Sequence, residues 1–439
     1  MSLEIQKIYL QFKDNYSESD IARRIANGAF WSFAGTAVSK LIVLVSGIIC
    51  AHILGKAEYG ELGMVRSTIN LFIAIGGAGL GATATKYISE YRFSDKLKIS
   101  SIYLITNCFA FLFGVLICLL FYVSSDYLSD NYLHAPGLST SIKLGSLLLF
   151  VSILDSAQNG TLMGFEDFKS IAINTFIGSL FESIFMLVGA YYFGVMGAIL
   201  GFGCGYVIIF LTNFYAIKKN FQLLNIRTSF DNIDYEDLKL LYKFSIPAAL
   251  AGILVGPVFW VIRSMLVRED GFAELATYEV ADQWKIMLLF IPGTLSQIVL
   301  PILSSLSDKE TKTFWKVLRF NMFLNGGIAT VMALLVCIFS SFIMDLYGYS
   351  NDTIAPLVIL SISTVFTSLS SVVGSSISSK GQMWIGFGFN FLWAAMVISL
   401  SHVFIAQGMK ATGIALAIMI SYFIHTINQL IYLKYSFKE

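Results

Sequence analysis

The sequence predicts an all-α integral membrane protein with twelve transmembrane helices, arranged as two parallel six-helix repeats. Of its 439 residues, 56% are hydrophobic and only 13% are charged, about half the charged share of an average soluble protein. Twelve apolar stretches each supply the roughly 20 residues that a helix needs to cross a bilayer. Lipid offers the backbone no hydrogen-bond partners, so spans of this length form helices.

The twelve stretches fall into two sets of six on either side of a long polar connection. They lie near residues 28–53, 62–85, 99–122, 138–161, 170–190, 195–217, 244–267, 277–302, 318–341, 354–377, 384–406 and 411–433. We therefore expect four parts: a cytoplasmic amphipathic segment at 1–26, an N-terminal lobe at 27–217, a cytoplasmic linker at 218–243 and a C-terminal lobe at 244–439.

The distribution of basic residues predicts the orientation in the membrane. If both termini are cytoplasmic, most of the 29 Lys and Arg residues fall on the inner side, notably in 86–98, 218–243 and 309–319. Cytoplasmic connections carry such an excess of Lys and Arg. The opposite orientation would place these clusters outside.

The two halves also resemble each other in sequence. Gly197, Tyr206 and Lys218 align at one constant offset with Gly413, Tyr422 and Lys434. Six spans are an even number, so both copies enter the membrane from the same side and form a parallel repeat. Two such bundles facing each other leave a cleft between them.

Four basic residues lie in or beside the predicted spans: Lys40, Arg66, Arg263 and Lys285. A charge at the centre of a membrane helix costs about 2.5–3.5 kcal/mol on insertion scales. Because spans one and two correspond to spans seven and eight, we expect these cations to line one central cavity and bind an anionic substrate. The alternative is that they pair with nearby acids or extend to the membrane surface.

Four acidic residues in the spans are candidates for coupling transport to an ion gradient: Asp155, Glu182, Glu279 and Asp282. Ionisable side chains at membrane depth often mark ion pathways. The alternative is that they are internal partners of the cations; Glu279, Asp282 and Lys285 have the spacing of neighbours on one helix.

Hydroxyl side chains follow one face of span ten, including Ser368 and Ser371. They indicate either a hydrated face suited to sugar hydroxyls or close helix packing, which small residues allow. The five cysteines all lie in apolar stretches without metal spacing, so we expect no disulfide framework, metal or cofactor. A net charge of +1 argues against nucleic acid as a partner.

Several segments resemble the polysaccharide-transporter branch of the multidrug/oligosaccharidyl-lipid/polysaccharide (MOP) superfamily. They are Ala26–Trp31, Leu54–Gly60, Lys86–Glu90 and Gly164–Lys169. The resemblance implies two six-helix lobes in a V, as in multidrug (MATE) relatives, with alternating access. It also implies a Wzx-type flippase that moves undecaprenyl-diphosphate-linked oligosaccharides from the inner to the outer leaflet. Basic residues in that family's central cavity match Lys40, Arg66, Arg263 and Lys285 by location.

The expected function is therefore export of O-antigen, capsule or exopolysaccharide units across a bacterial or archaeal cytoplasmic membrane. The expected partners are the polyprenyl-diphosphate-linked glycan, membrane lipids, H⁺ or Na⁺ and the polysaccharide polymerase machinery. A multidrug cation antiporter of the same superfamily is the alternative. A membrane-embedded glycan polymerase or glycosyltransferase is disfavoured, because the longest outer connection, 123–137, leaves little room for catalytic groups.

Overall fold

The computed structural model describes residues 20–133, 136–230, 233–234, 239, 245, 254–296, 311–350, 353–380 and 382–436. These residues are almost entirely helical and include no strand, which confirms the predicted all-α class. Eight helices are long and apolar enough to cross a membrane. The predicted spans 244–267 and 277–302 fall partly outside the described residues, as does most of 1–26, so the count of twelve stays a prediction.

The N-terminal lobe contains four long helices and two short turns. They are α2 (Asp20–Tyr91), α3 (Lys96–Asp126), η1 (Tyr127–Tyr132), η2 (Pro136–Leu138), α4 (Ser139–Gly164) and α5 (Phe168–Leu223). The C-terminal lobe contains α8 (Val255–Asp270), α9 (Phe272–Leu288), α11 (Thr311–Ile338), α12 (Ser340–Leu346), α13 (Ile354–Ser379), α14 (Met383–Ala406) and α15 (Lys410–Ser436).

Two of the long helices are each interrupted by one glycine. Gly55 in α2 has φ 76° and ψ 173°, and Gly194 in α5 has φ 59° and ψ −144°. Residues with a Cβ rarely adopt a positive φ, so glycine is the residue that allows these breaks. Each glycine lies in or beside a connection between two predicted spans, so α2 and α5 each comprise a pair of spans.

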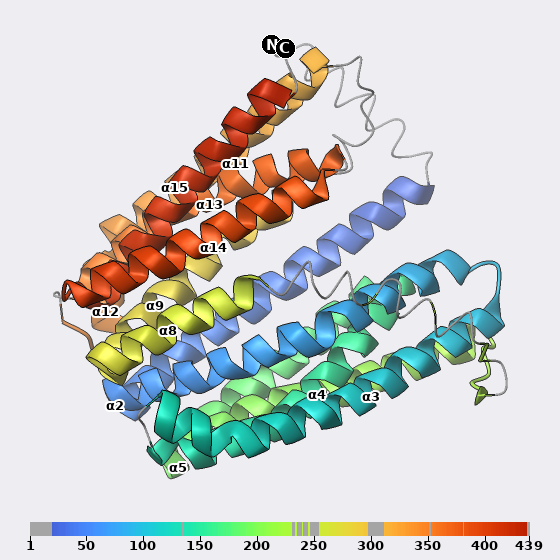
Figure 1. Cartoon of the computed structure of the whole chain (residues 1–439). Coiled ribbons are helices and arrows are strands. Elements are labelled where there is room, and N and C mark those ends of the chain that lie inside the picture. The colour runs from blue at the N-terminus through green and yellow to red at the C-terminus, as the bar shows by residue number, and fades with distance from the viewer. Residues whose placement is uncertain are drawn as a thin grey trace.

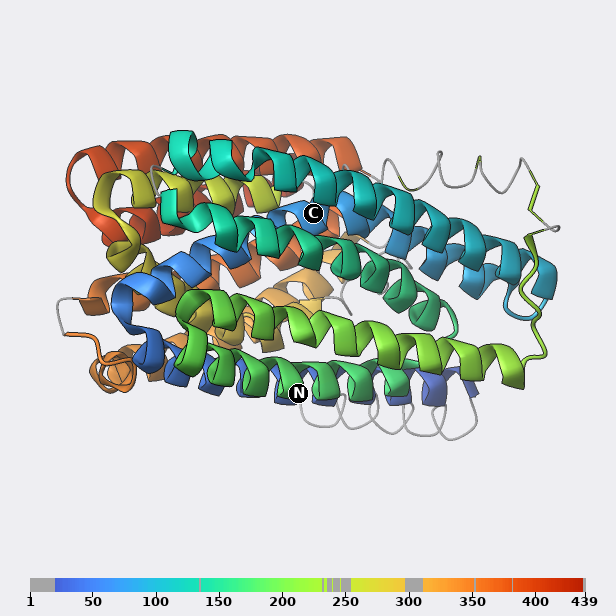
Figure 2. The same ribbon diagram turned by 90° about the horizontal axis from the view of Figure 1, so that it is seen from below.

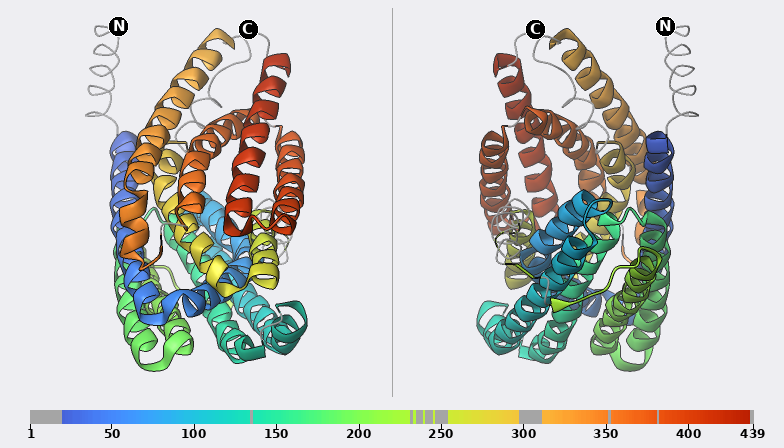
Figure 3. Two further views of the ribbon diagram at one scale, coloured as in Figure 1. Left: turned by 90° about the vertical axis from the view of Figure 1, so that its left-hand side faces the viewer. Right: turned by 90° about the vertical axis from the view of Figure 1, so that its right-hand side faces the viewer.

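The two lobes form a V (Figure 1). Figure 2 shows α3, α4 and α5 running side by side, and Figure 3 shows α11, α13, α14 and α15 gathered on the other side of the molecule. The lobes meet where α2 packs against α8 and α9. From there they spread toward the end of the molecule at which α2 begins and α15 ends (Figure 1).

The buried cores follow the same division. The largest core joins residues of both lobes, such as Leu62 and Tyr278. Toward the open end, one smaller core contains N-lobe residues such as Ile88 and Ile217 with Phe221 and Ile226, which follow them in the chain, and another contains only C-lobe residues such as Leu318 and Leu433. Each lobe is therefore packed internally, while apolar contact between the lobes is concentrated at the closed end.

Candidate functional site

The closed end of the V depends on glycines in α2 that allow close approach of the C-lobe. A Cβ at Gly60 would overlap the carbonyl oxygen of Phe272, and one at Gly63 would press on the side chain of Glu279. We call this region, Tyr59–Thr68 of α2 with Trp260 and 272–283 of the C-lobe, the interlobe junction. Hydrogen bonds also cross it, including Trp260 Nε1 donating to Thr68 Oγ1 at 3.0 Å.

Gln283 is a junction residue to which the sequence alone assigned no role. Its Oε1 accepts from Tyr59 Oη at 3.2 Å and from Tyr347 Oη at 3.1 Å. Its Nε2 donates to the Val43 carbonyl at 3.2 Å. The available signal was the position of this amide within a membrane span, because a side-chain amide at membrane depth needs hydrogen-bond partners.

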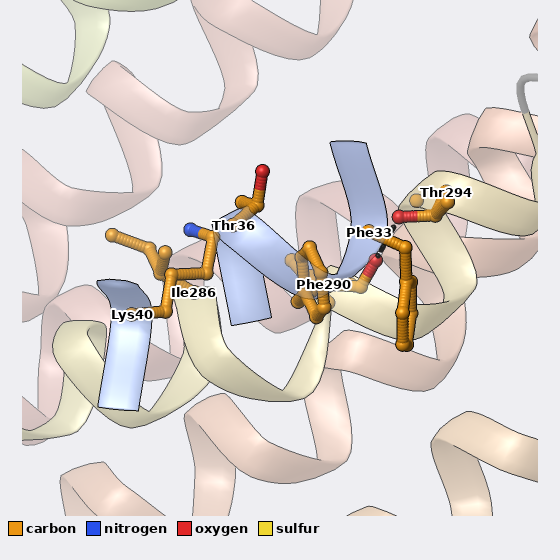
Figure 4. A pocket seen from close by; sticks show the side chains of 8 residues that line it. Phe33, Thr36, Lys40, Ile286, Phe290 and Thr294 are labelled. Atoms are coloured by element: carbon orange, nitrogen blue, oxygen red, sulfur yellow. Dashed lines mark hydrogen bonds between the residues drawn. The ribbon is translucent and has the colours of Figure 1, made fainter. Parts of the chain in front are cut away.

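Lys40 lies in a pocket between the two lobes (Figure 4). The pocket, of about 370 Å³, is lined by Phe33, Thr36 and Lys40 of α2 and by Ile286, Phe290 and Thr294 from the other lobe. The Lys40 ammonium is half-buried and lies 5.9 Å from the centre of the Phe290 ring. Within the described part of the chain it forms no ion pair, so its charge is available to an anion.

Arg66 belongs to the interior of the N-terminal lobe. Its Nη2 lies 3.1 Å from Glu182 Oε1, and its guanidinium lies 4.5 Å from the centre of the Phe202 ring. Both charged side chains are about four-fifths buried. Arg66 and Glu182 therefore neutralise each other.

Arg263 and Lys285 belong to a buried network in the C-terminal lobe. Arg263 Nε lies 2.6 Å from Glu279 Oε1, and its Nη2 lies 2.7 Å from Asp282 Oδ2. Lys285 Nζ pairs with the other oxygen of Asp282. Arg263, Asp282 and Lys285 are each at most 7% exposed, and the network of two cations and two anions has no net charge.

The arrangement differs from the expectation of four cations in one open cavity. In this structure only Lys40, of the four, faces an interlobe pocket without an acidic partner among the described residues. The reason is the cost of burying an unpaired charge, which favours pairing with any acid on a neighbouring turn or helix. Three of the four candidate acids, Glu182, Glu279 and Asp282, are those partners; the fourth, Asp155, is buried without one.

Some of the hydroxyl side chains on this face of α13 are buried by helix packing and others are exposed. Ser368 is 2% exposed and donates to the carbonyl of Val365 in its own helix at 2.9 Å. Ser370 reaches Gln429 of α15 at 3.2 Å. Ser371 is exposed. Close packing therefore accounts for Ser368, and Ser371 keeps its hydroxyl on the surface of α13.

Comparison with known proteins identifies the family. Residues 25–307 match the family described as "Polysaccharide biosynthesis protein". The chain belongs to this family. An EPS I polysaccharide export inner membrane protein of Ralstonia solanacearum is 24% identical over 402 residues, covering 88% of this chain and 89% of that protein. The lipid III flippase of Escherichia coli K12 is 23% identical over 301 residues, covering 67% of this chain and 71% of that protein.

Solved structures confirm the MOP-type fold. An inward-facing MATE transporter of the MOP superfamily matches with a TM-score of 0.75 and 16% identity, over 91% of this chain and 94% of that one. A MOP superfamily transporter from Pyrococcus furiosus matches with a TM-score of 0.71 and 16% identity, over 96% of this chain and 97% of that one. The predicted membership of the polysaccharide-transporter branch is confirmed. The chain is a multi-pass membrane transporter rather than an enzyme.

Proposed function

We propose that the protein flips undecaprenyl-diphosphate-linked oligosaccharides from the inner to the outer leaflet of the cytoplasmic membrane. The observation that carries the proposal is the interlobe pocket with the uncompensated Lys40 ammonium. A diphosphate offers several anionic oxygens to such a cation, and charge-assisted hydrogen bonds are stronger than neutral ones. The names of the relatives in Ralstonia and Escherichia coli point to the same class of cargo.

The shape of the molecule supports alternating access. The lobes touch at the interlobe junction and separate toward the chain ends, which we expect to be cytoplasmic because of the excess of basic residues on that side. A glycolipid head would enter from the inner leaflet while its polyprenyl tail stays in lipid. Lobes 27–217 and 244–439 would then rock about the junction, with 218–243 as the linker between them.

The predicted site residues differ in how they would contact the substrate in this proposal. Lys40 contacts the diphosphate first. Arg66, Arg263 and Lys285 reach it only if the rocking motion opens their ion pairs, and Ser371 offers a hydroxyl toward sugar. A proton or sodium gradient supplies the energy, and the polysaccharide polymerase machinery receives the product. The multidrug antiporter alternative shares the fold, but a cationic pocket is poorly suited to cationic drugs.

Removal of the gene tests the cargo class. We expect a polyprenyl-linked oligosaccharide to accumulate in the inner leaflet and surface polysaccharide to disappear, because synthesis continues while translocation stops. Extracted lipid-linked glycans, analysed by mass spectrometry, report the accumulation, and a plasmid copy of the gene should reverse it. Unchanged surface polysaccharide and unchanged glycolipid pools would contradict the proposal.

A further inference from the structure

The connection between α12 and α13 contacts the opposite lobe, although both of its helices belong to the C-terminal lobe. Tyr347, Gly348 and Tyr349 reach α2 of the N-terminal lobe, either directly or through Gln283. We call these three residues the strap. The strap joins the lobes in addition to the direct packing of α2 on α8 and α9.

Hydrogen bonds at the end of α12 fix the shape of the strap. Gly348 N donates to the Asp345 carbonyl at 2.9 Å, and Tyr349 N donates to the Met344 carbonyl at 3.0 Å. This pair of bonds is the Schellman motif, which needs a left-handed residue and favours glycine there; Gly348 has φ 71°. The tyrosines on either side are 1% and 6% exposed. Because these bonds lie within the C-terminal lobe, the turn would keep its shape when the lobes separate.

Gln283 of α9 joins the strap to the N-terminal lobe. Its Oε1 accepts from Tyr347 and from Tyr59 of α2, and its Nε2 donates to the Val43 carbonyl of α2. An amide oxygen has two lone pairs, so the two tyrosines saturate it. The amide fits against α2 because Gly47 has no Cβ, which would lie 2.5 Å from Nε2. Separation of the lobes would break every contact of Gln283 with α2.

Two further contacts extend the strap along α2. Lys56 Nζ lies 5.3 Å from the centre of the Tyr349 ring, within the range of a cation–π interaction. The His52 ring lies against Gly348, where a Cβ would be 3.4 Å from Nε2. His52 and Lys56 flank Gly55, at which α2 is interrupted. The strap therefore contacts α2 on both sides of this interruption.

The residues that hold the strap adjoin the Lys40 pocket. Val43, which accepts from Gln283, follows Lys40 by three residues in α2. Ile286, which lines the pocket (Figure 4), follows Gln283 by three residues in α9. Three residues are about one helical turn, so α2 and α9 both reach the pocket one turn from Gln283.

We propose that the strap and Gln283 form a latch, which holds this end of the V closed and must release before cargo leaves the Lys40 pocket on the outer side. The latch rests on the proposed flippase function, because it controls the exit of that cargo. Its hydrogen bonds and its cation–π contact join the two lobes only while the junction is closed.

Distances between two spin labels test the latch without any glycolipid. In a chain whose native cysteines are replaced, labels at Asp130 and Gln407, exposed residues of opposite lobes at the closed end, should move apart when the junction opens. Gln283→Met removes three hydrogen bonds, so we expect the open-to-closed ratio to rise by about tenfold or more. Tyr347→Phe removes one neutral hydrogen bond and should raise it about two- to tenfold. Double electron–electron resonance in nanodiscs measures the ratio.

Tyr215→Phe is the matched control. Tyr215 is 71% exposed near the end of α5, so loss of its hydroxyl should leave the distances unchanged. Should Gln283→Met not yield monodisperse protein, Gly47→Ala keeps Gln283 and fills the space of its amide. This variant should raise the open-to-closed ratio as well.

Cross-linking the strap to α2 tests its effect on transport. His52→Cys with Ser350→Cys places two thiols at exposed positions, one on α2 and one directly after the strap. A reducible bis-maleimide that joins them should stop flipping of a polyprenyl-diphosphate-linked oligosaccharide in proteoliposomes, and reduction of the linker should restore it. Each single cysteine variant, treated in the same way, should continue to flip.

Equal distance distributions in the wild type and the latch variants, or undiminished flipping by the cross-linked protein, would overturn the proposal. The distance measurement contains no glycolipid, so it is independent of the flippase assignment. A protein that shows the expected changes in distance, but whose wild type moves no glycolipid, would retain the latch as the contact that closes the lobes and lose the proposed function.

Discussion

Arg263→Ala is expected to destabilise the protein by about 3–5 kcal/mol, the range measured when one partner of a buried ion pair is removed. Arg263 contacts both Glu279 and Asp282 and is 7% exposed. Asp282 would keep Lys285 as a partner, whereas Glu279 would lose the ion pair described here. Thermal unfolding of the purified protein and its level in the membrane measure the effect.

Two further variants distinguish a structural role of Arg263 in ion pairing from a direct contact of Arg263 with the substrate. Arg263→Ala combined with Glu279→Gln removes one charge of each sign and should recover much of the lost stability. Lys143→Ala, at an exposed ion pair with Asp126, should change stability little, since such pairs are screened by water. A stable Arg263→Ala protein that fails only in transport would show instead that Arg263 acts on the substrate.

Gly60→Val is expected to abolish transport while leaving a folded protein. In the closed junction a Cβ at this position would overlap the Phe272 carbonyl oxygen. That oxygen belongs to the backbone, which cannot move aside as the end of a flexible side chain could. Separation of the lobes at this end would relieve the clash, so the variant should favour the conformation that is open at the junction.

Accessibility of the junction tests this expectation. In a chain whose native cysteines are replaced, a cysteine at Thr68, which is 2% exposed in the closed junction, should react with an impermeant maleimide from outside only when Gly60→Val is present. Gly137→Val is the control, because Gly137 is exposed and a Cβ there meets nothing within 4 Å. A Gly60→Val protein that transports normally would contradict the proposed rocking motion.

Much of the fold could be predicted because lipid imposes length and composition on each helix. The spans on either side of Gly55 and Gly194 were recognisable as separate, and the structure interrupts the helix at each of these glycines. The family was also recognisable, because its segments fall at the span boundaries near Leu54–Gly60 and Lys86–Glu90. These are local features, which a single sequence displays directly.

Contacts between helices far apart in sequence could not be predicted. The pairing of Lys285 with Asp282 was visible as a helical spacing, but the reach of Arg263 from α8 to α9 depends on how those helices pack. Arg66 and Glu182 are 116 residues apart. The same limit concealed the role of Gln283, whose partners Tyr59 and Tyr347 come from α2 and from the end of α12.

Flipping of a polyprenyl-diphosphate-linked oligosaccharide in proteoliposomes is the most direct test of the central claim, that Lys40 receives the anionic head. An impermeant glycosidase outside the vesicles measures the rate at which glycan from the inner leaflet becomes cleavable. We expect the wild type to flip and Lys40→Arg to keep most of its rate. Lys40→Ala should be slower by about tenfold or more, because a hydrogen bond to a charged group contributes about 1.5–3 kcal/mol. Equal rates for Lys40→Ala and the wild type, or no flipping by the wild type, would contradict the account.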